Sequence, residues 1–518
     1  MKIVSARTAV ALAAAFAASV AVWAFLGRAQ DVPGGLAPGQ RIECVSYTPL
    51  QGAETPAEFS VDPARLERDF ALLSRQVGCI RLYSMKGMER VPEVARRYGL
   101  QVIAGAWVNR EQGDTEREIE ALIEVANRYP DTIRAVLVGN EVLLRREASA
   151  ATLAGYLRRV RGAVRQPVSY GDVWEFWLQN SELGAEVEFL TIHLLPYWEN
   201  DPTGIDGAIE AVARARTAIV ARFPGKEVLI GETGWPSEGR RREDAQPGRV
   251  EEARFVRGFV ARARSEGWHY NLIEAFDQPW KRAQEGAVGG YWGLFDAGRN
   301  DKHILRGQVA QIADWNSHLG VALGLLIALL ALGRTSAPRA LAIDWLVANG
   351  VAMHLQQMSL YSRGMAESLW FLLLAAAALL AALLWSARCR GQAAPSWHDA
   401  ALVLIAGLAA TELLGLAFDA RYRHFPYAVF AGPACVVGAL GIADPVWRAR
   451  GRALALAMLP CLPALLWQET PANGEALVWL ALCGLMLAGL LRRGAQPPSR
   501  SAPLSASASM ASTAAGAP

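Results

Sequence analysis

Cysteine and histidine are scarce in this sequence, which has six cysteines and seven histidines among 518 residues. Neither type recurs at the spacing of metal ligands, and His193, His269 and His303 stand far apart, so we expect no metal site and no cofactor. Charged residues are also few, at 19%, and the formal net charge is only +3. Such a small charge gives no reason to expect a nucleic-acid partner.

Apolar residues are plentiful, at 52%, and they are distributed unevenly. After residues 1–27, residues 28–39 look like a linker and residues 40–315 like a soluble domain with regularly placed charges. Residues 316–493 contain long apolar runs separated by short arginine-containing loops, and the Pro/Ser/Ala-rich residues 494–518 are expected to be a disordered tail. The length and this division predict two or more regions.

The N-terminus has the pattern of a segment that directs export. Lys2 and Arg7 precede the apolar run Thr8–Leu26, which predicts either a cleaved signal sequence or an uncleaved signal anchor. The run is long for a cleavable signal and no small-x-small site follows it, so we favour the anchor. In both cases the next residues are exported.

The C-terminal half contains seven apolar runs that predict helices. The six clear runs are Leu319–Leu332, Leu369–Trp385, Ala400–Phe418, Tyr427–Ile442, Ala453–Trp467 and Ala476–Leu491. The seventh, Ala340–His354, contains Asp344 and Asn349, so a helix lying on the membrane interface is the alternative to a span.

Arginine positions favour seven spans over six. If the seventh run crosses, the loops 333–339, 386–399 and 443–452 and the end of the last run face the cytoplasm together. Arg421 and Arg423 are the one pair that disagrees. We therefore predict a multi-pass protein of the inner (cytoplasmic) membrane, with the lipid bilayer as a partner and the soluble domain on the periplasmic side.

The soluble domain alternates short apolar runs with longer helical patterns. The expected strands are Ile42–Tyr47, Cys79–Tyr83, Val102–Ala106, Ala135–Val138, Val168–Tyr170, Phe189–His193, Glu227–Ile230 and Asn271–Phe276. Eight such units predict an α/β fold of the (β/α)₈ TIM-barrel type, with another α/β fold as the alternative. In a barrel, polar residues at strand ends meet at one mouth.

Two of these strands end in glycine followed within two residues by glutamate, in Gly139-Asn140-Glu141 and Gly231-Glu232. Glycine allows the backbone to turn at the barrel mouth, so both acids are expected to face one cavity. Paired carboxylates cleave glycosidic bonds when one donates a proton to the leaving oxygen and the other attacks the anomeric carbon. Asn140 is placed to hydrogen-bond the sugar 2-hydroxyl.

Several strings resemble glycoside hydrolase family 17 and occur in that family's order. They are IRLYS (80–84), VGNEVLLR (138–145), IGETGWPSEG (230–239), EAFDQPWK (274–281) and YWGLF (291–295). The resemblance implies a retaining enzyme acting on β-1,3-glucan, with Glu141 as acid/base and Glu232 as nucleophile. It also implies that Tyr83 lines the −1 subsite and that Lys281 and Glu285 form a charged pair near the nucleophile.

Other residues of the domain have less certain roles. Aromatic side chains form platforms for sugar rings, and we expect Trp235, Trp280 and Tyr197 among the substrate-binding residues. His193 is either a sugar ligand or a structural histidine, and Arg81 is expected to pair with an acid beneath the site. Cys44, which stands where family 17 commonly has glycine, either forms a disulfide with Cys79 or remains a thiol.

Three functions fit these residues. Transfer of a glucan chain and hydrolysis share the first chemical step, and we favour transfer because the domain is held at a membrane beside a multi-helix region. The third is a barrel that only binds glucan within an export or synthesis complex. Such a barrel is expected to lack one of the two carboxylates, and both are present here. A glucan synthase is a possible partner of the helices, whose Asp344 and Glu412 are functional candidates or interhelical hydrogen-bond donors and acceptors.

Overall fold

A closed barrel of eight parallel strands forms the first half of the chain. The structure, a computed structural model, describes residues 6–50, 54, 61–335, 337–418 and 422–494. The strands follow one another round the barrel in sequence order. They are β2 (Ile42–Ser46), β3 (Val77–Arg81), β4 (Gln101–Ala106), β5 (Ile133–Asn140), β6 (Val168–Val173), β7 (Leu190–His193), β8 (Val228–Thr233) and β9 (His269–Leu272). The predicted TIM-barrel fold class is confirmed.

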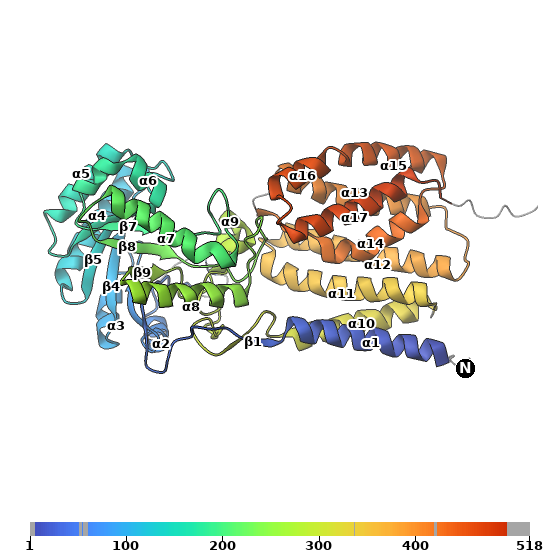
Figure 1. Cartoon of the computed structure of the whole chain (residues 1–518), viewed down its shortest axis with the longest axis horizontal. Coiled ribbons are helices and arrows are strands. Elements are labelled where there is room, and N and C mark those ends of the chain that lie inside the picture. The colour runs from blue at the N-terminus through green and yellow to red at the C-terminus, as the bar shows by residue number, and fades with distance from the viewer. Residues whose placement is uncertain (1–5, 51–53, 55–60, 336, 419–421, 495–518) are drawn as a thin grey trace, which may run out of the picture.

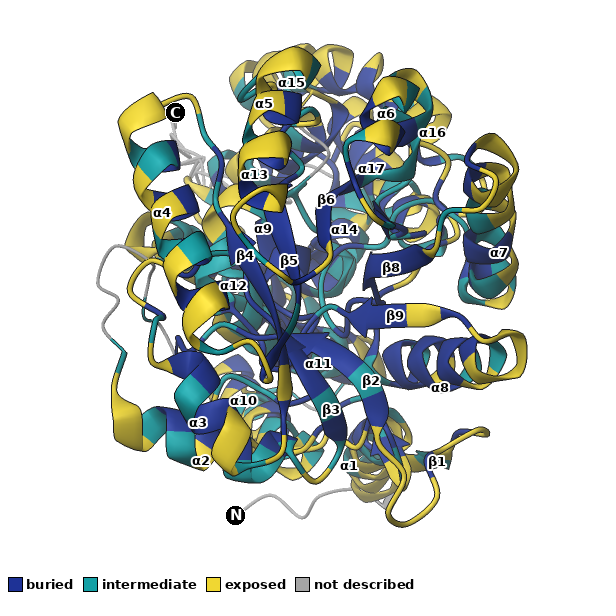
Figure 2. Ribbon diagram, turned by 90° about the vertical axis from the view of Figure 1, so that its left-hand side faces the viewer, coloured by how far each residue is buried: buried dark blue, intermediate teal, exposed yellow. Residues whose placement is uncertain are grey.

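Helices enclose the strands on the outside. They are α2 (Pro63–Leu73), α3 (Val91–Arg97), α4 (Gln112–Arg128), α5 (Ala150–Arg161), α6 (Trp174–Gln179), α7 (Ile205–Arg222) and α8 (Arg249–Glu266). Helix α9 (Arg282–Gly289) lies instead at the barrel end that faces the bundle (Figure 1). Local sequence fixes several of their ends, for example at α5, where the Ser149 hydroxyl accepts a hydrogen bond from Thr152 N. Figure 2 shows the buried strands inside a ring of helices whose outer faces are exposed.

The interior of the barrel is filled by apolar side chains and a disulfide. Cys44 of β2 and Cys79 of β3 are register partners and are joined by a disulfide, which decides the alternative left open by the sequence. They pack with Leu137 in a buried cluster inside the barrel. Ser46 and Arg81 lie two residues further along the same strands and so face the same interior, nearer the mouth.

The segment predicted as a linker contains a strand. β1 (Ala29–Asp31) pairs antiparallel with β10 (Gln308–Ala310), and Gln30 is the register partner of Val309. This two-stranded sheet joins the chain as it enters the barrel to the chain as it leaves.

A bundle of long helices forms the second half together with the N-terminal helix (Figure 1). The helices are α1 (Ala6–Leu26), α10 (Trp315–Gly333), α11 (Pro338–Tyr361), α12 (Met365–Cys389), α13 (His398–Phe418), α14 (Tyr427–Leu440), α15 (Pro445–Met458), α16 (Cys461–Glu469) and α17 (Gly474–Leu491). All seven predicted runs lie in helices, with α15 and α16 sharing one run. Within the described residues, six helical segments are long and apolar enough to cross a membrane, the segment Pro445–Glu469 counting as one.

The weakest of the predicted runs lies inside the bundle. It corresponds to α11, which packs against α10, α12 and α14. Asp344 is buried in α11 and lies 3.5 Å from the Ser386 hydroxyl of α12, and Asn349 Oδ1 accepts a hydrogen bond of 3.1 Å from Trp23 Nε1 of α1. Trp370 Nε1 of α12 likewise donates to Glu412 of α13. These polar groups therefore form interhelical hydrogen bonds.

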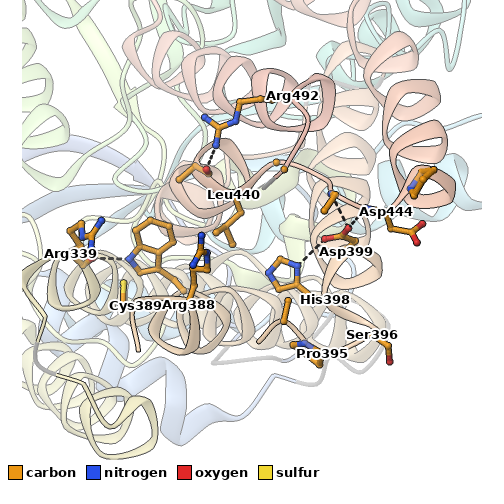
Figure 3. A pocket seen from close by; sticks show the side chains of 17 residues that line it. Arg339, Arg388, Cys389, Pro395, Ser396, His398, Asp399, Leu440, Asp444 and Arg492 are labelled. Atoms are coloured by element: carbon orange, nitrogen blue, oxygen red, sulfur yellow. Dashed lines mark hydrogen bonds and ion pairs between the residues drawn. The ribbon is translucent and has the colours of Figure 1, made fainter. Parts of the chain in front are cut away.

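The two ends of the bundle differ in character. At the end far from the barrel, Arg339, Arg388 and Arg492 line one cavity of about 600 Å³, as Figure 3 shows. These arginines thus gather at one end, whereas Arg363, in the loop between α11 and α12, lies at the barrel end. Arg423 lies at the barrel end, with its guanidinium against Gly415 of α13, and Arg421 lies outside the described residues.

The barrel end of the bundle is in contact with the loops that follow β8 and β9. Arg240 forms a buried ion pair with Glu469 at the end of α16, and Arg241 Nη2 donates to Ala472 O at 2.8 Å. Tyr291 Oη donates to Leu360 O at the end of α11 at 2.6 Å. The mouth of the barrel is therefore close to the helices.

Candidate active site

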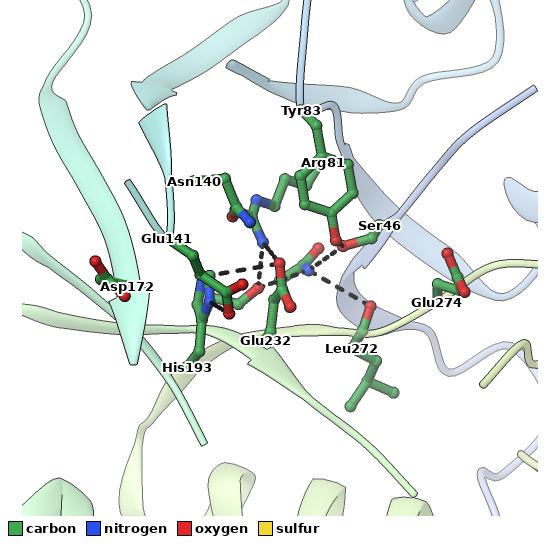
Figure 4. A network of polar contacts seen from close by, with 12 residues as sticks. Ser46, Arg81, Tyr83, Asn140, Glu141, Asp172, His193, Glu232, Leu272 and Glu274 are labelled. Carbon is green, nitrogen blue, oxygen red and sulfur yellow. Dashed lines mark hydrogen bonds and ion pairs between the residues drawn. The ribbon is translucent and has the colours of Figure 1, made fainter. Parts of the chain in front are cut away.

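A cavity of about 940 Å³ lies at the carboxyl ends of the barrel strands. Glu141 and Glu232, the two acids selected from the sequence, both line it, from β5 and β8 respectively. One carboxylate oxygen of each lies within 4.8 Å of the other. Tyr83, Asn140 and His193 line the same cavity, so the structure brings these five predicted site residues together (Figure 4).

The backbone after β5 turns sharply to present Glu141. Gly139 has φ +90°, and a Cβ there would lie 2.6 Å from Val142 Cγ2. Glu141 itself has φ +52°, in the left-handed region, which costs an L-residue about 1–2 kcal/mol. Its amide donates to Gly171 O at 2.7 Å, which helps to hold the turn. Strain of this kind is concentrated at functional sites.

Arg81 is the cation beside Glu232. Its Nη1 donates to Glu232 Oε1 at 2.8 Å and to Gly231 O at 3.0 Å, and its Nη2 donates to the Asn140 side-chain oxygen. Both Arg81 and Glu232 are buried, so their mutual attraction is weakly screened. The acid that Arg81 was expected to pair with is therefore the predicted nucleophile itself.

The surroundings of Glu232 keep this acid ionised. Burial alone would raise its pKa, but His193, Arg81, Lys281 and a hydrogen bond from Tyr83 together lower the pKa below the ordinary value for glutamate. In contrast, burial raises the pKa of Tyr83 well above the ordinary value, and the charge of Glu232 raises it further. The Tyr83 hydroxyl therefore remains a hydrogen-bond donor.

His193 lies between the two acids. Its Nδ1 is 2.9 Å from Glu141 Oε1 and its Nε2 is 3.8 Å from Glu232 Oε1. The ring is buried at the end of β7 and borders the cavity. The contacts with both carboxylates hold the ring in place at the edge of the cavity.

Asp172 is a buried acid near the site that the sequence reasoning missed. It lies on β6, where Tyr170 Oη donates to its carboxylate and Leu143 N donates to Oδ2 at 3.2 Å. Burial raises its pKa to about 6. The string Tyr-Gly-Asp at the end of a predicted strand was the available signal, but without a motif it did not stand out.

Lys281 has a direct partner that the family resemblance did not name. Its Nζ lies 2.9 Å from both oxygens of Glu274, while Glu285 lines the same cavity. Burial would lower the pKa of Lys281, but Glu274 and Glu285 more than compensate and raise it. The Lys281–Glu274 pair is close enough to Glu232 for its ammonium group to act on the nucleophile.

Two of the three predicted aromatic platforms are wrong. Trp235 is fully buried beneath the cavity, where its Nε1 donates to Gln246 O at 2.9 Å and its ring stacks on Phe255. Tyr197 is also buried, and its hydroxyl donates to Arg240 O at 2.6 Å. Both rings belong to the packing that supports the loops.

Other aromatic rings line the cavity instead. Trp280 does so as predicted, and its Nε1 donates to Gln278 Oε1 at 2.9 Å. Trp107, Trp198 and Trp292 line it as well. Trp198 stacks on Trp292 with 6.5 Å between ring centroids. Trp107 follows β4 and was missed because no acid or motif accompanies it.

Glu141, His193 and Glu232 are also residue types that bind metals, and their donor atoms lie within 4.8 Å of one another. Arg81, however, already places a positive charge against the Glu232 oxygen that would coordinate the ion. A second cation at this oxygen would be repelled. The expectation of a metal-independent site stays a prediction.

Comparisons with known proteins agree with the resemblance seen in the motifs. The family described as "BtgE/BtgC glycoside hydrolase domain" matches residues 44–293. "Probable beta-glucosidase btgE" of Aspergillus fumigatus is 28% identical over 264 residues, which are 49% of this chain and 45% of that protein. "Glucan 1,3-beta-glucosidase" of Schizosaccharomyces pombe is 28% identical over 257 residues, covering 46% of this chain and 79% of that protein.

The chain is also similar to a solved structure at lower identity. It is an active-site mutant of a Rhizomucor miehei beta-1,3-glucanosyltransferase in complex with laminaritriose, with a TM-score of 0.46 and 22% identity over 52% of this chain and 98% of that one. The chain spans less than half the length of the Aspergillus relative, and the matched family covers the barrel alone. The barrel of this chain is similar to the BtgE/BtgC glycoside hydrolase domains, and these matches support the family 17-like assignment that its motifs indicate.

Proposed function

We propose that this chain is a membrane-held, retaining enzyme that acts on β-1,3-glucan and transfers the cleaved chain to a second glucan. The observation that carries the proposal is the separation of Glu141 and Glu232, whose nearest oxygens lie within 4.8 Å. Retaining enzymes place the two carboxyl groups about 5–5.5 Å apart, whereas inverting enzymes separate them by about 6.5–9.5 Å to admit a water molecule. The name of the Schizosaccharomyces relative, a glucan 1,3-beta-glucosidase, supports a β-glucan substrate.

The electrostatics support different roles for the two acids. Glu232, beside Arg81 and near Lys281, is held as a carboxylate and attacks the anomeric carbon. Glu141 has the more accessible side chain, with 21% exposed against 6% for Glu232, and it donates a proton to the oxygen of the leaving sugar. The C–O bond of the leaving group breaks as the Glu232–sugar ester forms.

In the second step Glu141, now a carboxylate, removes the proton from an acceptor hydroxyl. The acceptor oxygen attacks the anomeric carbon, and Glu232 leaves as a carboxylate, so the β configuration is restored. Water as acceptor gives hydrolysis, and a glucan hydroxyl gives transfer. We favour transfer because the barrel is fixed at the end of a helical bundle, where it would modify a glucan near the membrane rather than digest soluble polymer.

The test uses the full-length chain in detergent micelles with reduced laminari-oligosaccharides, followed by mass spectrometry over time. Products longer than the donor are expected. A time course that yields only shorter products would make the enzyme an endo-β-1,3-glucanase. A donor that stays unchanged, under conditions in which a known β-1,3-glucanase cleaves it, would contradict the β-1,3-glucan assignment.

We further propose that the barrel lies on the periplasmic side of the inner membrane. Two observations support this side. The arginine-lined end of the bundle is opposite the barrel, as expected for a cytoplasmic end. The barrel also contains the Cys44–Cys79 disulfide, and disulfides persist in oxidising compartments such as the periplasm.

Thiol labelling tests this orientation. In a chain whose four free cysteines are replaced, Ser396→Cys would report the arginine-lined end and Asp201→Cys the exposed surface of the barrel. A membrane-impermeant maleimide added to cells with a permeabilised outer membrane should label Asp201→Cys alone. Labelling of Ser396→Cys alone would reverse the proposed orientation.

A further inference from the structure

One residue of the helical region lines the active-site cavity. Tyr422, in the segment between α13 and α14, borders the same cavity as Glu141, Glu232 and Glu285. Its side chain is half-buried, so part of the ring remains accessible from the cavity. The surface that a substrate meets is thus built from both halves of the chain.

The barrel is shaped to receive Tyr422 at helix α9. Gly286 in α9 has φ +71°, and a Cβ there would lie 2.9 Å from Tyr422 Cβ and 3.0 Å from its Cα. Only glycine combines this backbone conformation with such a close approach. Glu285, the residue before Gly286, lines the cavity, so Tyr422 packs at the edge of the binding surface.

Contacts on both sides hold this junction together. Arg282 Nη1 at the start of α9 donates to Leu360 O at 2.6 Å, and Tyr291 Oη donates to the same carbonyl. The Arg240 guanidinium lies over the ring of Phe425, at 5.1 Å from its centroid, three residues after Tyr422. Phe425 is buried. The position of Tyr422 is therefore determined by packing between the two halves.

The chemistry of a tyrosine ring suits a sugar. Its apolar face packs on the hydrogens of a pyranose ring while its edge and hydroxyl hydrogen-bond. Trp280, Trp292 and Trp198 provide further rings around the cavity, from the barrel. We propose that Tyr422 contacts the glucan chain at the α9 edge of the cavity, so that the helical region completes the substrate site and favours chains long enough to reach it. This inference rests on the proposed β-1,3-glucan activity.

The test compares kcat/KM of the full-length chain for laminari-oligosaccharides of increasing length. Tyr422→Ala should lower kcat/KM roughly three- to tenfold for the longer chains, mainly through KM, and leave the shortest cleaved chain nearly unaffected. Tyr422→Phe, which keeps the ring, should retain most of the length preference, and Tyr422→Leu, which keeps apolar bulk, should lose it. Trp397→Ala changes an exposed aromatic residue in another loop of the bundle and should change nothing.

Equal loss at every length, or no loss, would overturn the proposal, as would better use of longer chains by Tyr422→Ala. Calorimetry measures binding of the same oligosaccharides to Glu232→Gln, with and without Tyr422→Ala. It separates the role of Tyr422 from the β-1,3-glucan specificity itself. Binding that is independent of Tyr422 contradicts this inference alone. An absence of binding to Glu232→Gln removes the β-1,3-glucan assignment and this inference with it.

Discussion

At the scale of single residues, Arg81 connects the parts of the site. Its guanidinium reaches Glu232, the backbone oxygen of Gly231 and the side chain of Asn140, and its carbon Cζ lies 4.6 Å from the centroid of the Tyr83 ring. A planar fork with several donors is needed for such a set, and a lysine offers only a point charge. Arg81 is therefore placed as a positioning residue and as the counter-charge of Glu232, the proposed nucleophile.

Arg81→Lys should lower kcat/KM roughly 10–200-fold, because hydrogen bonds to charged groups contribute about 1.5–3 kcal/mol each. It should also move the acid limb of the pH profile to higher pH. In the wild type, the lowered pKa of Glu232 keeps this acid ionised at acidic pH. In the variant the counter-charge is weaker and the pKa of Glu232 is higher, so activity is lost at a higher pH as the solution is acidified. Arg134→Lys, which changes an ion pair with Glu43 away from the cavity, is the control. An unmoved acid limb would contradict the role of Arg81 as counter-charge.

Glu141→Ala should separate the two carboxylate roles by the leaving group. Loss of a general acid should slow cleavage of oligosaccharides by about 10²–10⁴-fold. Aryl glycosides with an acidic phenol need little protonation, so their first step should be affected far less. Burst kinetics with a nitrophenyl glycoside measure this step, and equal losses for both substrate types would argue against Glu141 as the acid.

At the scale of elements, periodicity was enough to predict most of the fold. Helices α7 and α8 follow the longer helical patterns of the sequence, because these patterns are uninterrupted between breaking residues. The strands occur in the predicted order, but their ends differ from the predicted ends by a few residues. The limits of an apolar run do not determine where the backbone hydrogen bonds between strands stop. The expected strand Asn271–Phe276, for example, already ends at Leu272 in β9.

Local sequence could not predict which aromatic rings face the cavity. Trp235 directly follows a strand-end motif, yet Phe255 of α8 covers its ring. Trp107 has no motif but is exposed to the cavity, where the Arg145 guanidinium lies 4.0 Å from its ring centroid. These differences depend on contacts between distant segments.

The disulfide between β2 and β3 provides a prediction at this scale. Cys44 and Cys79 are 35 residues apart, and closing such a loop in the unfolded chain stabilises the fold by about 2–4 kcal/mol. Replacing both by alanine should lower the temperature at which activity is lost. Cys389→Ala, which removes a half-buried free thiol of α12, should not. An unchanged temperature of activity loss in the double variant would contradict a stabilising disulfide. Titration of six reactive thiols in the denatured wild-type chain, in place of four, would show that the disulfide is absent.

At the scale of the whole molecule, the barrel and the bundle behave as one unit in this structure. The junction contains several polar contacts, and its Arg240–Glu469 ion pair is buried, with side chains 5% and 6% exposed. Asn473 Nδ2 also donates to Glu469 at 2.7 Å. No pattern in the sequence marked this pair, because its members are 229 residues apart.

Glu469→Ala should loosen the junction, because it leaves Arg240 buried without its counter-charge, a change that costs about 3–5 kcal/mol in buried pairs. Hydrogen–deuterium exchange in residues 234–248 should then become faster. Asp206→Ala, which breaks the exposed pair with Arg254, should cost no more than about 1 kcal/mol and leave this exchange unchanged. Unaltered exchange in Glu469→Ala would show that the junction does not depend on this pair.

The central claim is that Glu232 forms a covalent bond to the sugar. The most direct test incubates the full-length chain with a 2-deoxy-2-fluoro-laminaribiosyl fluoride, whose fluorine slows the second step, and maps the product by peptide mass spectrometry. The account predicts one added laminaribiosyl group on the peptide that contains Glu232, and no label on the Glu232→Gln variant. A label on Glu141, or full turnover of the reagent with inversion at the anomeric carbon, would contradict it.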